Sequence, residues 1–292
     1  MKHKWSKIIL FCVIIGLFIT FVPFSNMDSA NSDAPKEVFI KADITEQLIF
    51  DNRDIIIKAV SLDMNAPTGP ALKFYGENST ELDRLVTLKY CSVNDIMVEP
   101  EFEMSLNAKG TAQAEAIFPK RLLVTAGIET FSSISFSLHI AEPSESGSYV
   151  ESDQFNMITS MTGSYEQKHG FTGSRIADAN GVKIMIGRKP DPEAALGKQI
   201  YIYIDNSLSE DIVIETKRVC IDGIELQPLF ISTVCAGKEC WAPLTFQDSE
   251  IIENGIVDIN ELTISFKALN IFGVIIDTDD CRIIFDNENS DS

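Results

Sequence analysis

The sequence predicts an all-β protein in which two tandem antiparallel β-sandwiches follow an N-terminal hydrophobic helix. Three observations predict this fold class: short runs of alternating apolar and polar residues, turn-forming residues between those runs, and a self-similarity at a spacing of 128 positions. Strands with one buried face alternate in this way because successive side chains point to opposite faces. We expect immunoglobulin-like sandwiches, with a small barrel as the alternative architecture.

The N-terminal 1–30 stretch predicts export. Three lysines, Lys2, Lys4 and Lys7, precede an apolar run that extends from Ile8 to Phe24. The length of this run lies between that of a signal-peptide core and that of a short membrane span. No cleavage site with small residues at both required positions follows it. We therefore expect either a signal peptide or a signal anchor, with the remainder of the chain secreted or at the cell surface.

Charge excludes two classes of partner. Lys and Arg number 24 against 43 Asp and Glu, which gives a formal net charge of −19. A surface this acidic repels nucleic-acid phosphates and anionic lipid headgroups. We therefore expect no nucleic-acid partner, and contact with a membrane only through the N-terminal segment.

An internal repeat predicts the domain organisation. Residues 69–140 align without a gap on residues 197–268, and many core positions that differ exchange one apolar residue for another. The alignment predicts a first sandwich over 36–158, a linker rich in Ser, Thr and Gly over 159–173, a second sandwich over 174–287 and a polar tail over 288–292. The identical pairs include Tyr75/Tyr203, Asn78/Asn206, Pro100/Pro228, Phe118/Phe246 and Gly127/Gly255.

Local patterns place the elements within each copy. Alternating runs rich in Ile, Val, Tyr and Phe predict strands, and Asn, Asp and Gly between them predict tight turns. Two short segments, Pro119–Ala126 and Ser249–Asn254, each predict one helical turn ahead of a glycine. The clearest strands are Leu72–Tyr75, Ile200–Ile204, Ile212–Thr216 and Leu262–Phe266.

The second copy carries a pattern of turn and core residues. It runs through Asp205-Asn-Ser207, Cys220-Ile-Asp-Gly223, Pro228, Ala236-Gly-Lys238 and Glu253-Asn-Gly-Ile256. This pattern resembles a β-sandwich repeat domain of uncharacterised exported proteins from Gram-positive bacteria. The first copy departs from it at Asn94-Asp95, where the glycine is missing. The resemblance implies export and a sandwich fold, and it implies no activity.

Catalytic motifs are absent from the sequence. Beyond the export segment there are only two histidines, His139 and His169, and we find no nucleophile elbow, Walker loop, HExxH motif or EF-hand spacing. We therefore predict no catalytic residue and no cofactor-binding residue. A carboxylate-based hydrolase stays open as an alternative, because a glycosidase needs only two facing acids.

Two local clusters suggest a metal or a disulfide. Asp277, Asp279 and Asp280 gather carboxylate oxygens, which a hard cation such as calcium prefers. The alternative is a solvated acidic turn. Cys235 and Cys240 flank a turn-like Ala-Gly-Lys-Glu segment across which a disulfide would fit. Buried free thiols are the alternative for that pair.

Aromatic residues of the second copy suggest a binding surface. Tyr201 and Tyr203 alternate with isoleucines, so both point to one face of their strand. Trp241 is the only tryptophan beyond the export segment. It either fills a core or serves as a binding platform. The first copy has Gln113 in place of Trp241.

The function that fits these observations is a non-catalytic binding, interaction or structural module. Its expected partner is an extracellular protein or glycan. The alternatives are an extracellular carboxylate-based, glycosidase-like hydrolase and an envelope accessory protein. Because the polar candidates differ between the copies, we expect any specific activity to belong to one copy, with the second copy favoured.

Overall fold

The computed structural model describes residues 39–52, 54–143, 148–169, 171, 173–187 and 198–285, all within one compact unit. The expected export segment 1–30 and the tail 288–292 lie outside these residues. Within the described ranges, no helix is long and apolar enough to cross a membrane. The structure is mostly β, as the alternation predicted, and nearly all of its strand pairs are antiparallel.

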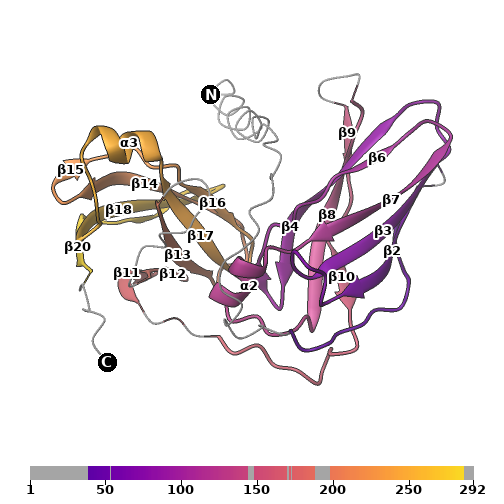
Figure 1. Cartoon of the computed structure of the whole chain (residues 1–292), viewed down its shortest axis with the longest axis horizontal. Coiled ribbons are helices and arrows are strands. Elements are labelled where there is room, and N and C mark those ends of the chain that lie inside the picture. Colours follow the sequence, from indigo (N-terminus) through magenta and orange to yellow (C-terminus); the bar gives the residue numbers. More distant parts are fainter. Residues whose placement is uncertain are drawn as a thin grey trace. The chain divides into compact units, whose positions relative to one another are not determined.

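The first set of elements forms what we call lobe 1. Its strands and single short helix, drawn from indigo to rose in Figure 1, are β1 (Gln47–Asp51), β2 (Ile55–Asp63), β3 (Ala71–Asn78), β4 (Arg84–Val93), β5 (Ile96–Met97), β6 (Met104–Leu106), β7 (Gly110–Ile117), α2 (Lys120–Thr125), β8 (Ser133–Ala141), β9 (Tyr149–Glu151) and β10 (Phe155–Ile158).

The second set forms lobe 2. Its elements, drawn from rose to yellow, are β11 (Ser174–Ala179), β12 (Val182–Ile186), β13 (Lys198–Asn206), β14 (Ile212–Ile221), β15 (Ile224–Glu225), β16 (Ile231–Val234), β17 (Lys238–Phe246), α3 (Asp248–Glu253), β18 (Glu261–Asn270), β19 (Gly273–Asp277) and β20 (Cys281–Ile284).

Elements recur at the spacing of the sequence repeat. β14 begins at residue 212 and β4 at residue 84, a difference of 128, and both strands contain ten residues. The helices α2 and α3, which begin at residues 120 and 248, differ by the same 128. Both helical turns predicted from the sequence are therefore confirmed.

Lobe 1 is a sandwich of two sheets. One contains β1-β2-β3-β7, and the other contains β10, β8 and β4, with β5 and β6 on β4 and β9 on β8. Strands β2, β3 and β7 therefore share one sheet, and β4, β8 and β10 share the other. This is the A-B-E and C-F-G distribution of immunoglobulin-like sandwiches. Side chains of the two sheets meet in one core, where Phe74 and Phe136 lie edge to face with ring centroids 5.7 Å apart.

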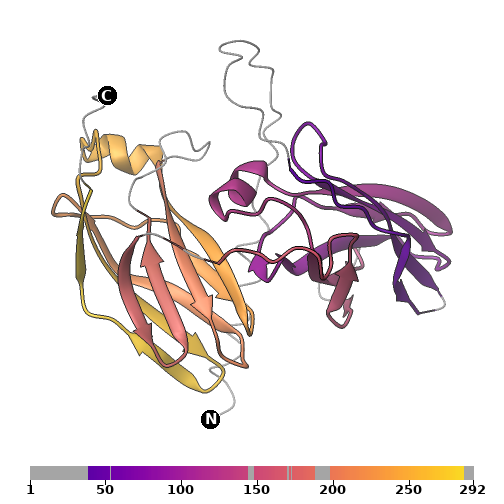
Figure 2. The ribbon, with the colours of Figure 1, turned by 90° about the horizontal axis from the view of Figure 1, so that it is seen from below.

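Lobe 2 repeats this arrangement. The sheet β11-β12-β13-β17 faces the sheet built from β14, β18 and β19, and side chains of both sheets form a second core. Figure 2 shows these strands from below. Isoleucines dominate the second core on the β13 side, where Ile200, Ile202 and Ile204 are fully buried. Burial of each such side chain contributes about 1.5–3 kcal/mol to the free energy of folding.

A short parallel pairing joins the two lobes. Ile96 and Met97 of β5 pair with Glu239 and Cys240 of β17, which makes one continuous sheet from β10 to β11. The backbone N–H of Glu239 donates to the carbonyl of Asp95 at 3.0 Å. The Lys238 ammonium lies 2.5 Å from the Asp95 carboxylate and fastens the same point.

The predicted linker is attached to lobe 1. The Thr159 hydroxyl donates to the Phe131 carbonyl at 2.6 Å, and the Gln167 side-chain amide donates to the Gly127 carbonyl at 3.0 Å. The buried Asn94 side chain also donates to the Gln167 side-chain oxygen at 3.0 Å. The Ser, Thr and Gly composition of segment 159–173 predicted a surface connection. These hydrogen bonds show that its first part packs on lobe 1.

Candidate functional site

The three aromatic residues predicted to form a binding surface lie together on one face of lobe 2. Tyr203 pairs with Trp241 across β13 and β17, and Tyr201 pairs with Pro243 two residues away. Since the isoleucines between the tyrosines enter the second core, both tyrosines point to the opposite face of the sheet. Strand pairing therefore brings these side chains together from segments about 40 residues apart.

Phe171, from the connection between the lobes, covers this face. Its ring centroid lies 4.6 Å from that of Trp241 in a perpendicular arrangement and 5.5 Å from that of Tyr203 in a stacked one. Tyr203 and Trp241 are themselves 5.4 Å apart. Aromatic pairs at such distances contribute about 0.5–1.5 kcal/mol beyond their burial. Trp241 is consequently only 8% exposed, and it belongs with Tyr203 to the core cluster of lobe 1.

A cavity of about 410 Å³ opens beside these rings. Both lobes and the connection contribute to its walls, which combine aromatic side chains with backbone and one ammonium group. The lining residues are Val124, Thr125, Ala126, Gly127, Lys168, Phe171, Gly187, Tyr201 and Trp241.

The residues at the end of α2, Val124 to Gly127, line this cavity. The carbonyls of Leu122, Leu123 and Val124 accept hydrogen bonds from the N–H groups of residues 126, 128 and 127 respectively. A helix leaves its last four carbonyls without helical partners. In the described part of the chain, the Thr125 carbonyl receives no backbone hydrogen bond from outside the helix. It remains an acceptor for solvent or for a ligand.

Charged groups behind the aromatic wall hold it in place. Burial and the neighbouring Glu239 carboxylate raise the pKa of Tyr203, so its hydroxyl keeps its proton and donates to Glu239. On the same carboxylate, the Nδ1 atom of His169 lies 3.0 Å from Oε1. Glu239 therefore connects β17, β13 and the connecting segment, and it positions the aromatic residues without lining the cavity.

The predicted calcium ligands are not brought together. Asp277 pairs with Lys217, and the Asp280 carboxylate lies 2.7 Å from the Arg218 guanidinium and 2.9 Å from the Ser265 hydroxyl. Among the residues that the structure describes, no group of three His, Cys, Asp or Glu side chains could hold a metal ion. Lys217 and Arg218 balance the negative charges of Asp277 and Asp280.

The disulfide considered for Cys235 and Cys240 is not formed, since both are free thiols. Burial raises the pKa of each thiol to about 11. The Cys240 Sγ atom lies 3.6 Å from the Ser232 hydroxyl oxygen. Cys235 is buried and Cys240 is half-buried, and both are free thiols, the alternative that their spacing left open.

His139 has a structural environment. It lies on β8 with Nδ1 3.4 Å from the Glu151 carboxylate, and its ring is 4.7 Å from that of Tyr149. Burial, together with the nearby Lys89, lowers its pKa. Nothing nucleophilic adjoins this ring in the contacts that the structure describes, so the site lacks the parts of a Ser-His or Cys-His machine.

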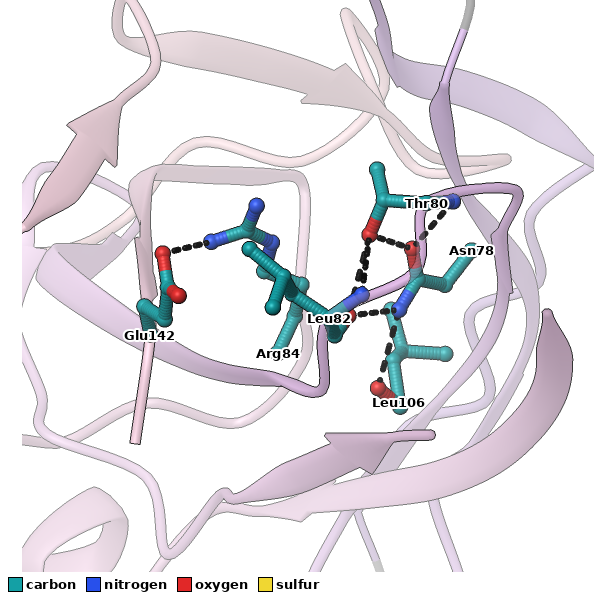
Figure 3. A network of polar contacts seen from close by, with 6 residues as sticks. All are labelled: Asn78, Thr80, Leu82, Arg84, Leu106 and Glu142. Atoms are coloured by element: carbon teal, nitrogen blue, oxygen red, sulfur yellow. Dashed lines mark hydrogen bonds and ion pairs between the residues drawn. The ribbon is translucent and has the colours of Figure 1, made fainter. Parts of the chain in front are cut away.

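A second cavity, of about 200 Å³, lies at one end of lobe 1 and includes Asn52, Asp54, Arg84, Glu142 and Tyr149 in its lining. The Arg84 Nη1 atom is 2.9 Å from the Glu142 carboxylate (Figure 3). Arg84 Nε is buried without a hydrogen-bond partner in the described residues. Lobe 2 has Ile212 and Asn270 at the equivalent positions, so this ion pair is particular to lobe 1.

Sequence reasoning missed Phe171, Lys168 and the end of α2. A signal for Phe171 was present, since it is the only phenylalanine in the Ser, Thr and Gly-rich connection 159–173. No sequence signal indicated that the Val124–Gly127 segment of one copy would meet the Trp241 face of the other.

Comparisons with known proteins assign no family. No family model matches the chain, and no curated protein matches it. Among solved structures, the YadV chaperone is similar over 79% of this chain and 100% of its own, with 12% identity and a TM-score of 0.25. A protein of unknown function from Porphyromonas gingivalis W83 covers 76% of this chain and 94% of its own, with 10% identity and a TM-score of 0.19.

The CupB2 chaperone of Pseudomonas aeruginosa is similar over 73% of this chain and 90% of its own, with 8% identity and a TM-score of 0.17. TM-scores in this range are too low to assign a fold. For this chain the fold follows from its own strand pairing.

Proposed function

We propose that this chain is an exported, non-catalytic binding protein whose ligand site is the cavity beside Trp241. The observation that carries the proposal is that Phe171, Tyr201, Trp241 and Lys168 line one open cavity of about 410 Å³. Cavities that bind small molecules have this mixture of aromatic walls and a few polar groups, and they have volumes of about 300–1,000 Å³.

The lining supports binding rather than catalysis. It contains no carboxylate, histidine or cysteine, so the paired acids of a glycosidase and the nucleophile and base of an acyl-transfer enzyme are missing from it. The basic n-region and apolar run at the N-terminus support export, which puts the site outside the cell.

The aromatic strand face of the site, with Tyr201 and Trp241, belongs to lobe 2 and has no equivalent in lobe 1. The equivalent face of lobe 1 carries Lys73 where lobe 2 has Tyr201, and the Lys73 ammonium lies 3.2 Å from the Glu115 carboxylate. Lys58 on the adjacent strand lies 2.9 Å from Glu46. Lobe 1 therefore presents a charged face and lobe 2 an aromatic one. This difference supports a proposal that only lobe 2 supplies the aromatic surface that binds the ligand.

This proposal is tested by measuring binding of the chain to ligand arrays. The full chain is applied to arrays of neutral oligosaccharides and of peptides, alongside Tyr201→Lys and Trp241→Gln, which install the residues of lobe 1. We expect saturable binding to at least one class, weakened at least tenfold by both substitutions. Gln113→Ala, on the equivalent strand of lobe 1, is the matched control and retains binding.

Two results would overturn the proposal: no binding to any arrayed ligand, or binding that both variants retain. Thermal unfolding of each variant separates loss of the site from loss of the fold. Tyr201 is half-buried, so Tyr201→Lys preserves the core if Trp241→Gln does not.

A further inference from the structure

We infer that the Trp241 cavity binds a neutral pyranose ring of an oligosaccharide. This inference rests on the proposed function and adds the chemical class of the ligand. Three features of the site carry it: the geometry of its aromatic walls, the mixture of donors and acceptors between them, and the charges nearby.

The aromatic walls fit the shape of a sugar ring. Phe171 and Trp241 stand at 90° to each other with centroids 4.6 Å apart, and Tyr201 lines the same space. Trp241 is only 8% exposed beneath Phe171, so the half-buried rings of Phe171 and Tyr201 supply most of the accessible apolar surface. A pyranose has an apolar face of C–H groups and a polar rim, so it can rest its face on one wall while the rim faces away from both.

The polar groups of the lining fit a rim of hydroxyls. Lys168, Thr125 and Tyr201 line the cavity, and their side chains carry an ammonium donor and two hydroxyls that can donate or accept. Each hydroxyl of a sugar both donates and accepts, so it can satisfy both kinds of group. A wholly apolar ligand would leave those groups that it covers without a hydrogen-bond partner, which disfavours its binding.

Charge excludes ionic ligands from both sides. Lys168 lines the cavity, so its positive charge disfavours a cationic ligand there. A polyanionic glycan would approach a chain whose formal net charge is −19. A neutral saccharide avoids both repulsions.

The strand edge beside the cavity is closed to peptides. Extended peptides commonly bind by adding a strand to a free sheet edge. Here β5 pairs with Glu239 and Cys240 of β17, and Leu229 exchanges two backbone hydrogen bonds with Thr245 of the same strand. The edge that flanks Trp241 is therefore occupied on both sides of this residue, which favours a sugar ring over a peptide.

Tryptophan fluorescence gives a direct readout of this site. The chain contains two tryptophans, Trp5 and Trp241, so in a full chain carrying Trp5→Phe all tryptophan emission comes from the cavity. The probes are maltohexaose, cellohexaose and chitohexaose, with a decaproline peptide in parallel. We expect a saturable change in Trp241 emission with at least one oligosaccharide and none with decaproline.

Two variants test the assigned contacts. Lys168→Ala removes the hydrogen-bond donor, and Tyr201→Lys removes one aromatic wall; each is expected to weaken oligosaccharide binding about three- to tenfold or more. Gln113→Ala is again the control and leaves the titration unchanged.

The outcomes separate this inference from the proposed function. A response to decaproline alone overturns the pyranose assignment and leaves a binding protein in place. A lack of response to every oligosaccharide, in a chain that binds arrayed peptides, has the same consequence. Oligosaccharide binding that survives both Lys168→Ala and Tyr201→Lys places the sugar elsewhere and overturns the assignment of this cavity.

Discussion

Asn78 and Asn206 make the same hydrogen bonds in the two lobes, 128 residues apart. The Asn78 amide nitrogen donates to the carbonyls of residues 82, 106 and 107 at 2.8, 3.1 and 3.1 Å, part of the network in Figure 3. The Asn206 amide donates to residues 210, 234 and 235 at 2.9, 3.0 and 3.1 Å. Each amide thus ties the end of one strand to the loop after it and to the end of a strand in the opposite sheet.

Replacing either asparagine should destabilise the chain. Asn78→Ala and Asn206→Ala each leave buried carbonyls without a donor, and we expect each to lower the free energy of unfolding by about 2–3 kcal/mol. Urea denaturation followed by circular dichroism measures the change. Asn156→Ala, on the exposed side of β10, is the control and should stay within about 0.5 kcal/mol of the parent. A loss below 1 kcal/mol for both buried variants would contradict a structural role for these amides.

The Arg84–Glu142 pair of lobe 1 can be replaced by the residues at the equivalent positions of lobe 2, Ile212 and Asn270. Its side chains are 19% and 9% exposed, so removal of one partner leaves the other charge largely buried. We expect Arg84→Ile alone to cost about 2–4 kcal/mol, and the double variant Arg84→Ile with Glu142→Asn, which carries the residues of lobe 2, to recover most of that loss. A double-mutant cycle from denaturant unfolding measures the coupling. Strictly additive effects would show that the pair contributes nothing.

Cys240 should react slowly with thiol reagents. Burial raises the pKa of its thiol to about 11, well above the ordinary value of about 8.5. At pH 8 the thiolate fraction is lower by about two orders of magnitude, and alkylation by iodoacetamide should be slower by at least that factor than in the urea-unfolded chain. Peptide mapping by mass spectrometry follows each cysteine separately, with the buried Cys91 as internal comparison. Rapid labelling of folded Cys240 would contradict its raised pKa.

Acid should weaken lobe 2 through Asp280. Hydrogen bonds from Arg218 and Ser265 lower the pKa of this carboxyl in the folded chain. Its contribution to stability is therefore fully present above the unfolded value of about 3.9 and is lost as the pH falls through the lower folded pKa. We expect Asp280→Asn to reduce the urea midpoint at pH 6 and to differ little from the parent at pH 2.5.

Asp279→Asn is the matched control for this pH dependence, since the structure describes no cation or hydroxyl contact for Asp279. Its urea midpoint should follow that of the parent at both pH values. An Asp280→Asn deficit that is equal at pH 6 and pH 2.5 would show that the carboxylate charge is not what stabilises this turn.

Much of the fold could be predicted from local sequence. The alternation at Ile200–Ile204 identified both the strand and its buried face, because a strand with one face in a core must alternate. The helical turns ahead of Gly127 and Gly255 were also predictable, since both glycines adopt a positive φ, of 66° and 67°, at the helix ends. The parallel pairing of β5 with β17 was not, because two-residue strands carry no periodic signal.

The candidate site was predictable only in part. The sequence indicated Tyr201, Tyr203 and Trp241, because an alternating strand and a single tryptophan can both be recognised in the amino-acid sequence. It also suggested a calcium site at Asp277, Asp279 and Asp280, where the structure instead has Lys217 and Arg218 beside two of the carboxylates. Clustered acids in a sequence do not reveal which cations fold against them.

By itself the sequence determined the β-rich fold class, the 128-residue repeat and the side of β13 that faces the core. These depend on periodicity and on turn residues, which act over a few positions. Only the tertiary structure decided that Phe171 covers Trp241, that α2 of one lobe meets the aromatic face of the other, and that Cys235 and Cys240 form no disulfide with each other. Those outcomes depend on contacts between residues far apart in the chain, whose partners are selected by packing of the whole unit rather than by local pattern.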